Sequence, residues 1–426
     1  MNKALLVFLI SLLAYSIKSA RHKEFNLGRE EDDNWLMSSE ASQGSSKDSA
    51  NSNVLQMEVV STTFSQYKDH FTYPLGDKFN QRYWYSDSYW DAEHDGPIFL
   101  HFCAEGTGHM VRINDEPARL AREFHGLVIA IEHRYYGESQ LFDDWSLPNM
   151  ELLTHEQALA DYAYFIQQRN IEYKEKHEKE FRWIVSGGSY AGALAAWFRY
   201  KYPHLAIGAV ASSGVVNAIK DFRMYMFQIL EDIEREPECK ETILELVKYA
   251  TDVILKGDVY EKFQFKKLMN ADMLDDKDFL MYFTDVYVGY IQYSDRRSMC
   301  KQIIKLKDYH RIPQLLAYTE VGRKNGLTPS DFTLQNEMNT TIHYQKNMRQ
   351  WMYQVCTAFG YFQTGDENNP LRWEGLDLAY EATLCKRMFG ENLMPDTYHT
   401  NALFGSVDIE HHVSNVIFIN GGDDPW

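Results

Sequence analysis

The stretch from Phe181 to Phe198, FRWIVSGGSYAGALAAWF, constrains the fold more than any other part of the sequence. An apolar run ends in a glycine-flanked serine, and a helical run of small and aromatic residues follows directly. A strand, a sharp turn and a helix in this order would project the Ser189 side chain from the end of a sheet. A nucleophilic serine is therefore predicted, with an ordinary glycine turn as the alternative.

The residues around this turn alternate between apolar runs and helical patterns. GPIFLHFC, GLVIAIEH, RWIVSG and AIGAVASSG predict buried strands, whereas THEQALADYAYFIQQR and YAGALAAWFRYKYP predict helices. Thr154 and Gln157 have the spacing of a capping box at the first of these helices. Continuous apolar strands that alternate with helices indicate an α/β fold, with a parallel sheet covered on both faces.

The pattern changes after about residue 217 and is mostly helical up to roughly residue 395. One predicted helix carries an apolar stripe of Ile243, Val247, Ala250 and Ile254. A strand pattern returns only at HVSNVIFINGG, for which we expect a buried strand. We therefore predict one α/β domain in two parts, 54–216 and 406–426, interrupted by a helical cap over 217–405.

The N-terminus has the pattern of a secretory signal. Residues 1–20 combine an early lysine, a short apolar run and then small residues, and the polar residues 21–53 suggest a flexible leader or propeptide. No later stretch is long and apolar enough for a membrane helix. We expect a secreted or lysosomal protein that has no membrane partner after signal cleavage.

Charge and cysteine content narrow the class further. A net charge of -18 over 426 residues argues against nucleic acid as a partner. The cysteine count is five, so at least one thiol is unpaired within the chain, and Cys103 in an apolar run is the candidate. Asn339 heads the only N-glycosylation sequon. We expect no cofactor and no metal.

A nucleophilic serine needs an oxyanion hole, an acid and a base. The backbone N–H of Tyr190 is the first predicted oxyanion donor, and the loop 104–108 is expected to supply a second. Asp423 and Asp424 follow a predicted strand, where the acid of this fold belongs, although GGDDP also has the composition of a turn. The base should come last in the chain, and none of the earlier histidines has that order: His101, His109, His133, His155, His411 and His412.

Five motifs together resemble a known serine peptidase family. GGSYAG, EHRYYGES, LTHEQALADYAYFI, FNQRYW and NGGDDPW are similar to motifs of the family of prolyl carboxypeptidase, dipeptidyl peptidase II and thymus-specific serine protease. The likeness covers about residues 65–426. It implies an α/β-hydrolase domain interrupted by a helical cap insertion. It also implies exopeptidase cleavage of peptide substrates, commonly at proline, through an acyl-enzyme.

The resemblance assigns roles to particular residues. Ser189 corresponds to the nucleophile, and Asp424 to the acid of the family's Asn-Gly-x-x-Asp-Pro-Trp segment. Trp426 corresponds to an aromatic residue of the proline-accepting subsite. Glu105 corresponds to the glutamate of a Gly-Gly-Glu loop whose glycines are here cysteine and alanine. These residues are the predicted catalytic and substrate-binding set.

The resemblance also implies two disulfides, Cys239–Cys300 and Cys356–Cys385. The sequence departs from the family at Ala358, where a glutamate is usual. The family's catalytic histidine lies beyond Asp-Pro-Trp, so we expect it outside these 426 residues.

Two other readings of the sequence remain. One is a catalytically inactive hydrolase-fold binding protein. The other is a lipase or esterase, which shares the serine turn but explains neither Asp-Pro-Trp nor the cysteine pattern. A homodimer is compatible with the sequence.

Overall fold

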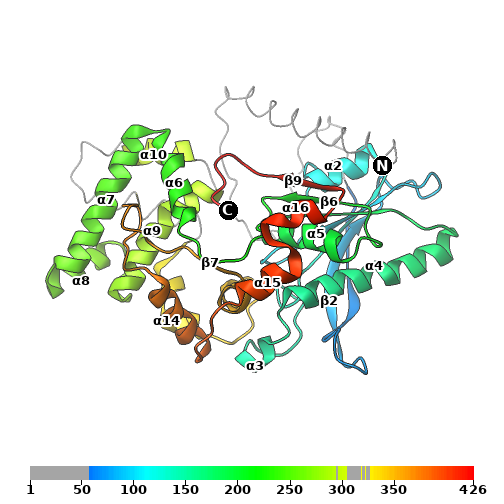
Figure 1. The fold of residues 1–426 in the computed structure, drawn as a ribbon, viewed down its shortest axis with the longest axis horizontal. Helices are drawn as coiled ribbons and strands as arrows, with labels where there is room; N and C mark the ends of the chain where they lie inside the picture. Colours follow the sequence, from blue (N-terminus) through cyan, green and yellow to red (C-terminus); the bar gives the residue numbers. More distant parts are fainter. Residues whose placement is uncertain (1–56, 294–295, 305–317, 319–321, 323–326) are drawn as a thin grey trace, which may run out of the picture. The chain divides into compact units, whose positions relative to one another are not determined.

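A seven-stranded sheet runs in the order β1-β2-β4-β3-β5-β6-β9. Figure 1 labels β2, β6 and β9 of this sheet. The computed structural model describes residues 57–293, 296–304, 318, 322 and 327–426, so the predicted signal peptide and leader lie outside the described residues. The strands are β1 (Val60–Tyr67), β2 (Lys78–Ser86), β3 (Ile98–Phe102), β4 (Leu127–Ile131), β5 (Trp183–Gly188), β6 (Gly208–Ser212) and β9 (Val416–Ile419). β1 and β2 pair antiparallel, as do β2 and β4, and every later pair is parallel. The sheet confirms the predicted α/β-hydrolase fold.

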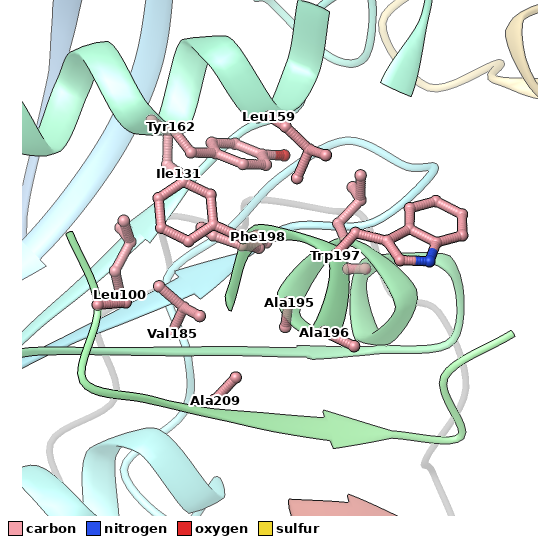
Figure 2. Close-up of a cluster of buried hydrophobic side chains, with 14 of the residues drawn as sticks. Leu100, Ile131, Leu159, Tyr162, Val185, Ala195, Ala196, Trp197, Phe198 and Ala209 are labelled. Atoms are coloured by element: carbon pink, nitrogen blue, oxygen red, sulfur yellow. The ribbon is translucent and has the colours of Figure 1, made fainter. Parts of the chain in front are cut away.

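One face of the sheet is covered by α4 (His155–His177) and α5 (Tyr190–Lys201), which contact each other. Figure 2 shows Leu159 and Tyr162 of α4 close to Phe198 of α5, above Leu100 and Val185 of the sheet. All five of these side chains are at most 1% exposed. Burying a large apolar side chain contributes roughly 1.5–3 kcal/mol, so this layer fixes α5 firmly on the strand that precedes it.

The opposite face of the sheet is also buried. Side chains alternate along a strand, and the alternate residues Phe99, Val128 and Ala130 are at most 2% exposed. The helix α2 (Glu116–Glu123) packs against β3 and β4 with an apolar side that includes Leu120. The prediction of strands buried on both faces is therefore confirmed for β3 and β4.

β9 differs from the predicted buried strand. Its residues are only partly buried, and Phe418 is 37% exposed. In the described part of the chain β9 pairs with β6 alone, so it forms an edge of the sheet. An edge strand has a neighbour on one side only, and its apolar sequence does not reveal this.

The helix α4 confirms half of its predicted capping box. The Thr154 side chain accepts a hydrogen bond from the Gln157 N–H at 3.2 Å. The Gln157 side chain does not return to the cap; it donates to Asp69 at 2.6 Å and accepts from the His70 N–H at 3.0 Å. The glutamine therefore fixes the loop between β1 and β2 on the helix.

The segment after β6 is mostly helical, as predicted, and the stripe of Ile243, Val247, Ala250 and Ile254 is buried. It also contains a small parallel sheet of β7 (Ile219–Asp221) and β8 (Gly360–Phe362) that the sequence did not indicate. Its longer helices are α6 (Met224–Glu234), α7 (Pro237–Lys256), α8 (Val259–Leu268), α9 (Asp276–Tyr293), α10 (Arg296–Ile304) and α14 (Leu378–Phe389). Shorter elements there and elsewhere are α3 (Leu147–Met150), α12 (Leu334–Glu337), α13 (Met348–Gln354), α15 (Thr397–Phe404), α16 (Ile409–His412), the 3₁₀ turns η1 (Pro329–Phe332) and η3 (Ser406–Asp408), and the π-helical turn η2 (Val355–Phe359).

The helical segment and the sheet domain have separate clusters of buried apolar residues. The cluster of the helical segment contains only residues between Tyr225 and Tyr380. The cluster formed by the sheet, α4 and α5 also includes Phe359, Tyr361 and Phe404. The later part of the predicted cap therefore packs on the sheet domain as well. The exact cap bounds, 217–405, stay a prediction.

Both predicted disulfides are present, Cys239–Cys300 with 5.2 Å and Cys356–Cys385 with 5.9 Å between the Cα atoms. Cys103 is free and buried, and burial raises the pKa of its thiol to about 12. Within the described ranges, no helix is long and apolar enough to cross a bilayer.

Candidate active site

Ser189 sits on a strained turn between β5 and α5. Its φ is 57° and its ψ is -128°, a backbone conformation that a residue other than glycine rarely adopts. Its N–H donates to the Ser212 carbonyl at 2.9 Å, and its own carbonyl accepts from the Ala193 N–H at 3.1 Å. These bonds, together with the buried helix that follows, hold the strained turn in place.

The glycines around the serine are not equivalent. A Cβ on Gly187 would lie 2.2 Å from the Ala191 carbonyl oxygen, and one on Gly192 would lie 2.6 Å from the Ser212 carbonyl oxygen. Only glycine fits at these two positions, because backbone atoms cannot move away cheaply. Gly188 has its nearest such neighbour at 4.0 Å. A close approach of backbone therefore requires glycine at Gly187 and Gly192 but not at Gly188.

The turn leaves a donor for negative charge beside the serine. Tyr190 is the first residue of α5, so its N–H has no acceptor within the helix. The predicted second donor lies in the loop after β3, and one of its N–H groups is already engaged. Gly108 donates to the buried Glu132 carboxylate at 2.8 Å. Gly108 is thus removed from the candidates, which leaves 104–107.

Asp424 follows β9 at the same edge of the sheet as Ser189. β5, β6 and β9 are neighbours, and the Ser213 N–H donates to the Ile419 carbonyl at 2.6 Å. Because parallel strands end at one edge, the segments that begin at Ser189 and after Ile419 are separated by β6 alone. The Asp424 carboxylate accepts from the Trp426 N–H at 3.1 Å.

Asp423 is engaged elsewhere. Its carboxylate pairs with Arg235 and, at 3.1 Å, with Arg296, and its side chain is 48% exposed. It therefore lies at the surface in an ion pair with the helical segment. This difference between two adjacent aspartates agrees with Asp424 as the candidate acid, a role that stays a prediction.

The histidines near the turn are held by other partners. His133 Nδ1 lies 2.7 Å from the Arg134 carbonyl and Nε2 lies 3.1 Å from the Tyr190 hydroxyl, while His101 Nδ1 lies 3.2 Å from the Ser186 hydroxyl. Burial lowers the pKa of both rings, and that of His155, to about 4. Among the residues that the structure describes, no histidine makes a hydrogen bond to Ser189.

The Trp426 ring packs among aromatic rings from the helical segment. Its centroid lies 5.6 Å from Phe222, 5.3 Å from Tyr225 and 5.3 Å from Tyr361. The indole Nε1 is buried and has no hydrogen-bond partner in the described part of the chain. An apolar surface with one free donor is suited to an organic ligand.

Glu105 lies in the loop after β3 and is partly buried. Burial raises the pKa of its carboxyl, and its Oε2 atom is buried with no hydrogen-bond partner among the described residues. Burial, and secondarily the Glu105 charge, also raises the pKa of Tyr136. Two candidate substrate-binding residues, Glu105 and Trp426, thus carry unused polar atoms.

Two predicted features lie elsewhere in the structure. Asn339 is exposed, and its side-chain oxygen accepts from the Thr341 N–H at 3.0 Å. Ala358 lies in the π-helical turn η2 and packs against the apolar cluster formed by the sheet, α4 and α5. Exposure of Asn339 is what glycosylation requires, and the modification itself stays a prediction.

Sequence analysis missed Gln354, a fully buried amide at the end of α13. It donates to the Tyr190 hydroxyl at 2.9 Å across 164 residues of sequence. Its only sequence signal was a polar residue in an otherwise apolar stretch before Cys356, which does not identify a partner.

Comparison with known proteins identifies the family. The profile described as "Serine carboxypeptidase S28" matches residues 66–426. "Probable serine protease EDA2" of Arabidopsis thaliana is 33% identical over 398 residues, which cover 89% of this chain and 78% of that protein. "Probable extracellular serine carboxypeptidase" of Arthroderma benhamiae is 30% identical over 418 residues, which cover 85% of this chain and 57% of that protein. "Thymus-specific serine protease" of Homo sapiens is 29% identical over 385 residues, which cover 82% of this chain and 73% of that protein. The chain therefore belongs to the serine carboxypeptidase S28 family.

Proposed function

We propose that this protein is a serine-type exopeptidase that cleaves peptides at proline-containing sites through an acyl-enzyme. The observation that carries the proposal is Ser189, held with φ 57° between β5 and the N-terminus of α5. Backbone strain of this kind costs on the order of 1–3 kcal/mol and persists where surrounding structure enforces it, often at active sites. The S28 family membership makes peptides the substrate class.

In the proposed reaction the Ser189 oxygen bonds to the scissile carbonyl carbon and passes its proton to a histidine. That histidine is proposed to lie outside the described residues, with Asp424 orienting its ring. The Tyr190 N–H and an N–H from 104–107 stabilise the tetrahedral oxyanion. The amine leaves with the proton, and water then hydrolyses the acyl-serine and restores the hydroxyl.

The proposed substrate contacts are Trp426 and Glu105. The Trp426 ring, beside Tyr225 and Tyr361, offers a flat apolar surface for a proline ring. Its Nε1 and the Glu105 Oε2 are buried polar atoms that a bound peptide could pair. We further propose that the protein is secreted, which is in line with its extracellular relative from Arthroderma benhamiae.

The test is peptide hydrolysis by the native full-length product. Two proline-containing peptides, one with a blocked N-terminus and one with a blocked C-terminus, separate carboxypeptidase from dipeptidyl peptidase activity. We expect cleavage of one of them, and a loss of at least about 10⁴-fold in kcat/KM for Ser189→Ala. Absence of cleavage of both peptides, or undiminished cleavage by the variant, would contradict the proposal.

The second candidate is a catalytically inactive binding protein on a hydrolase scaffold. One observation favours it: none of the described histidines makes a hydrogen bond to Ser189. This candidate predicts that the full-length product binds proline-containing peptides and leaves them intact. Ser189→Ala would then leave the affinity for those peptides unchanged.

A further inference from the structure

Four buried side chains form a chain of hydrogen bonds that includes Tyr190, the residue after Ser189. We call Tyr136, Gln354, Tyr190 and His133 the Tyr190 network. The Tyr136 hydroxyl donates to the Gln354 Oε1 at 2.6 Å, and the Gln354 Nε2 donates to the Tyr190 hydroxyl at 2.9 Å. The Tyr190 hydroxyl lies 3.1 Å from His133 Nε2. All four residues are at most 1% exposed.

The direction of each bond in the Tyr190 network is determined. The Arg134 carbonyl can only accept, so His133 Nδ1, 2.7 Å away, carries a hydrogen. The ring is neutral because burial lowers its pKa to about 4, which leaves Nε2 as an acceptor. The Tyr190 hydroxyl therefore donates to His133 and accepts from Gln354. With a neutral His133 ring, no other arrangement of protons satisfies all three hydrogen bonds.

The network acts on the residue that provides the oxyanion donor. Tyr190 follows the strained Ser189 and begins α5. Its peptide plane is held on the carbonyl side, where the Ser189 oxygen accepts from the Ala193 N–H at 3.1 Å, whereas the Tyr190 N–H itself has no acceptor within the helix. Relaxation of the Ser189 backbone would rotate the Tyr190 N–H. The phenol oxygen, fixed at the other end of the side chain by two partners, opposes that rotation. The ring itself packs 5.2 Å from Phe359 and 6.1 Å from Trp351, which follow and precede Gln354.

We propose that Gln354 and His133 are positioning residues, which aim the Tyr190 N–H at the oxyanion by holding the Tyr190 hydroxyl. The inference rests on the proposed function, because it needs a tetrahedral oxyanion at Ser189. It adds a specific claim: a hydroxyl that touches no reacting atom controls the chemical step. It also assigns α13, 164 residues further along the chain, a part in the oxyanion hole.

The experiment compares Tyr190→Phe with Tyr287→Phe in the native full-length product. Tyr287 is a matched control: it is fully buried, and its hydroxyl donates one hydrogen bond, to the Leu371 carbonyl at 2.6 Å. For Tyr190→Phe we expect kcat on a proline-containing peptide to fall about tenfold with KM within about twofold. This is a part of the roughly 10²–10³-fold effect of removing a whole oxyanion donor. Tyr287→Phe should lose similar thermal stability and keep its kcat.

A peptide boronate provides an independent readout, because it forms a tetrahedral adduct with the serine. We expect its affinity for Tyr190→Phe to fall by about the same factor as kcat, since transition-state analogues report transition-state contacts. His133→Gln, which retains an acceptor for the Tyr190 hydroxyl, should keep more activity than His133→Leu. Gln354→Met should resemble Tyr190→Phe.

The outcomes separate this inference from the proposed function. An active parent whose Tyr190→Phe variant keeps kcat and boronate affinity, with the same loss of stability as the control, would overturn the inference alone. A parent that neither cleaves peptides nor binds the boronate would overturn the proposed function, and the inference with it.

Discussion

Two regions of the molecule bury polar groups, and they differ in how those groups are paired. One is the Tyr190 network, and the other is a set of charged groups in the helical segment. In the Tyr190 network, neutral groups are joined in a continuous chain of hydrogen bonds. In the helical segment, four carboxyls surround two guanidinium groups. We call this second set the cap acid cluster; its members are Asp278, Asp285, Glu337, Arg372, Glu381 and Arg387.

The cap acid cluster has too few cations for its carboxyls. Arg387 bonds to Asp278 at 2.9 Å and to Glu337 at 3.0 Å, and Arg372 bonds to Asp285 at 2.5 Å. Burial raises the pKa of both Glu337 and Glu381 to about 7, against attraction from Arg387 and Arg372 respectively. Additional carboxylates, Asp275 and Asp278 for Glu337 and Asp285 and Asp377 for Glu381, raise these pKa values further.

The comparison shows where this protein should respond to pH. His101, His133 and His155 of the sheet domain each have a pKa of about 4, so they stay neutral between pH 5 and 8. The two buried glutamates of the cap acid cluster change charge within that range. We therefore expect the helical segment, and not the serine turn, to carry the pH dependence of stability.

The largest expected effect is a loss of stability in the sheet domain when Gly192 is replaced. Gly192→Ala would place a Cβ 2.6 Å from the Ser212 carbonyl oxygen and 3.1 Å from the Gly214 Cα, so the free energy of unfolding should fall by about 3 kcal/mol or more. Gly188→Ala is the matched control, and its change should stay within about 1 kcal/mol. Urea unfolding measures both, and equal losses would show that the close approach at Gly192 is not real.

The second largest expected effect is the loss of stability when the Cys239–Cys300 disulfide of the helical segment is removed. Replacing Cys239 and Cys300 by alanine removes a bridge between residues 61 apart, and we expect a loss of about 2–4 kcal/mol. Cys103→Ala, which removes only a buried thiol, should cost about 1 kcal/mol. The measurement is urea unfolding without reductant. If the double variant lost no more stability than Cys103→Ala, the bridge would contribute nothing to stability.

The pH response is the third test. The folded-state pKa of Glu381 is raised from 4.5 to about 7, so its stabilising contribution is complete below about pH 4.5 and is lost as the pH rises through 7. Between pH 5 and 8 this group should lower the free energy of unfolding by about 2–3 kcal/mol. Glu381→Gln, which stays neutral, should remove that part of the dependence and be more stable than the parent at pH 8.

The exposed Glu245 on α7 supplies the control for that titration. Glu245→Gln should leave the pH dependence of unfolding as it is in the parent. If Glu381→Gln and Glu245→Gln behaved alike, the cap acid cluster would not be the source of the pH dependence.

The smallest effect returns to the sheet side. Thr154→Ala removes the side-chain cap of α4, which accepts from the Gln157 N–H at 3.2 Å, and should cost about 1 kcal/mol. The loss should be the same at pH 5 and pH 8, because none of the groups that change charge in this range belongs to the cap. A loss confined to one pH would place a titrating group near α4 and weaken the contrast between the two regions.

Local patterns in the sequence predicted much of the sheet domain. Apolar runs gave β3, β4, β5 and β6, and the glycine-flanked Ser189 gave the turn with its following helix. These features arise from neighbouring residues, so periodicity and turn chemistry are enough to find them. The disulfide pairing was different: it came from the family resemblance, because five cysteines alone allow several pairings.

The features that were missed depend on contacts between distant residues. Gln157 was expected to close a capping box, yet the loop between β1 and β2 offered its side chain better partners. Gln354 meets Tyr190 only after the chain has folded, and Glu381 becomes unusual only because it is buried with other carboxyls. The exposure of β9 depends on which strands surround it. None of these has a signature in the residues on either side.

The central claim is that Ser189 is an activated nucleophile, and covalent labelling tests it most directly. The native full-length product would be treated with a fluorophosphonate, digested and mapped by mass spectrometry, with denatured protein as the control. We predict one added phosphonyl group, on the peptide that contains Ser189, in the folded protein only. A folded protein that stays unlabelled at Ser189, or is labelled at another serine, would contradict the account.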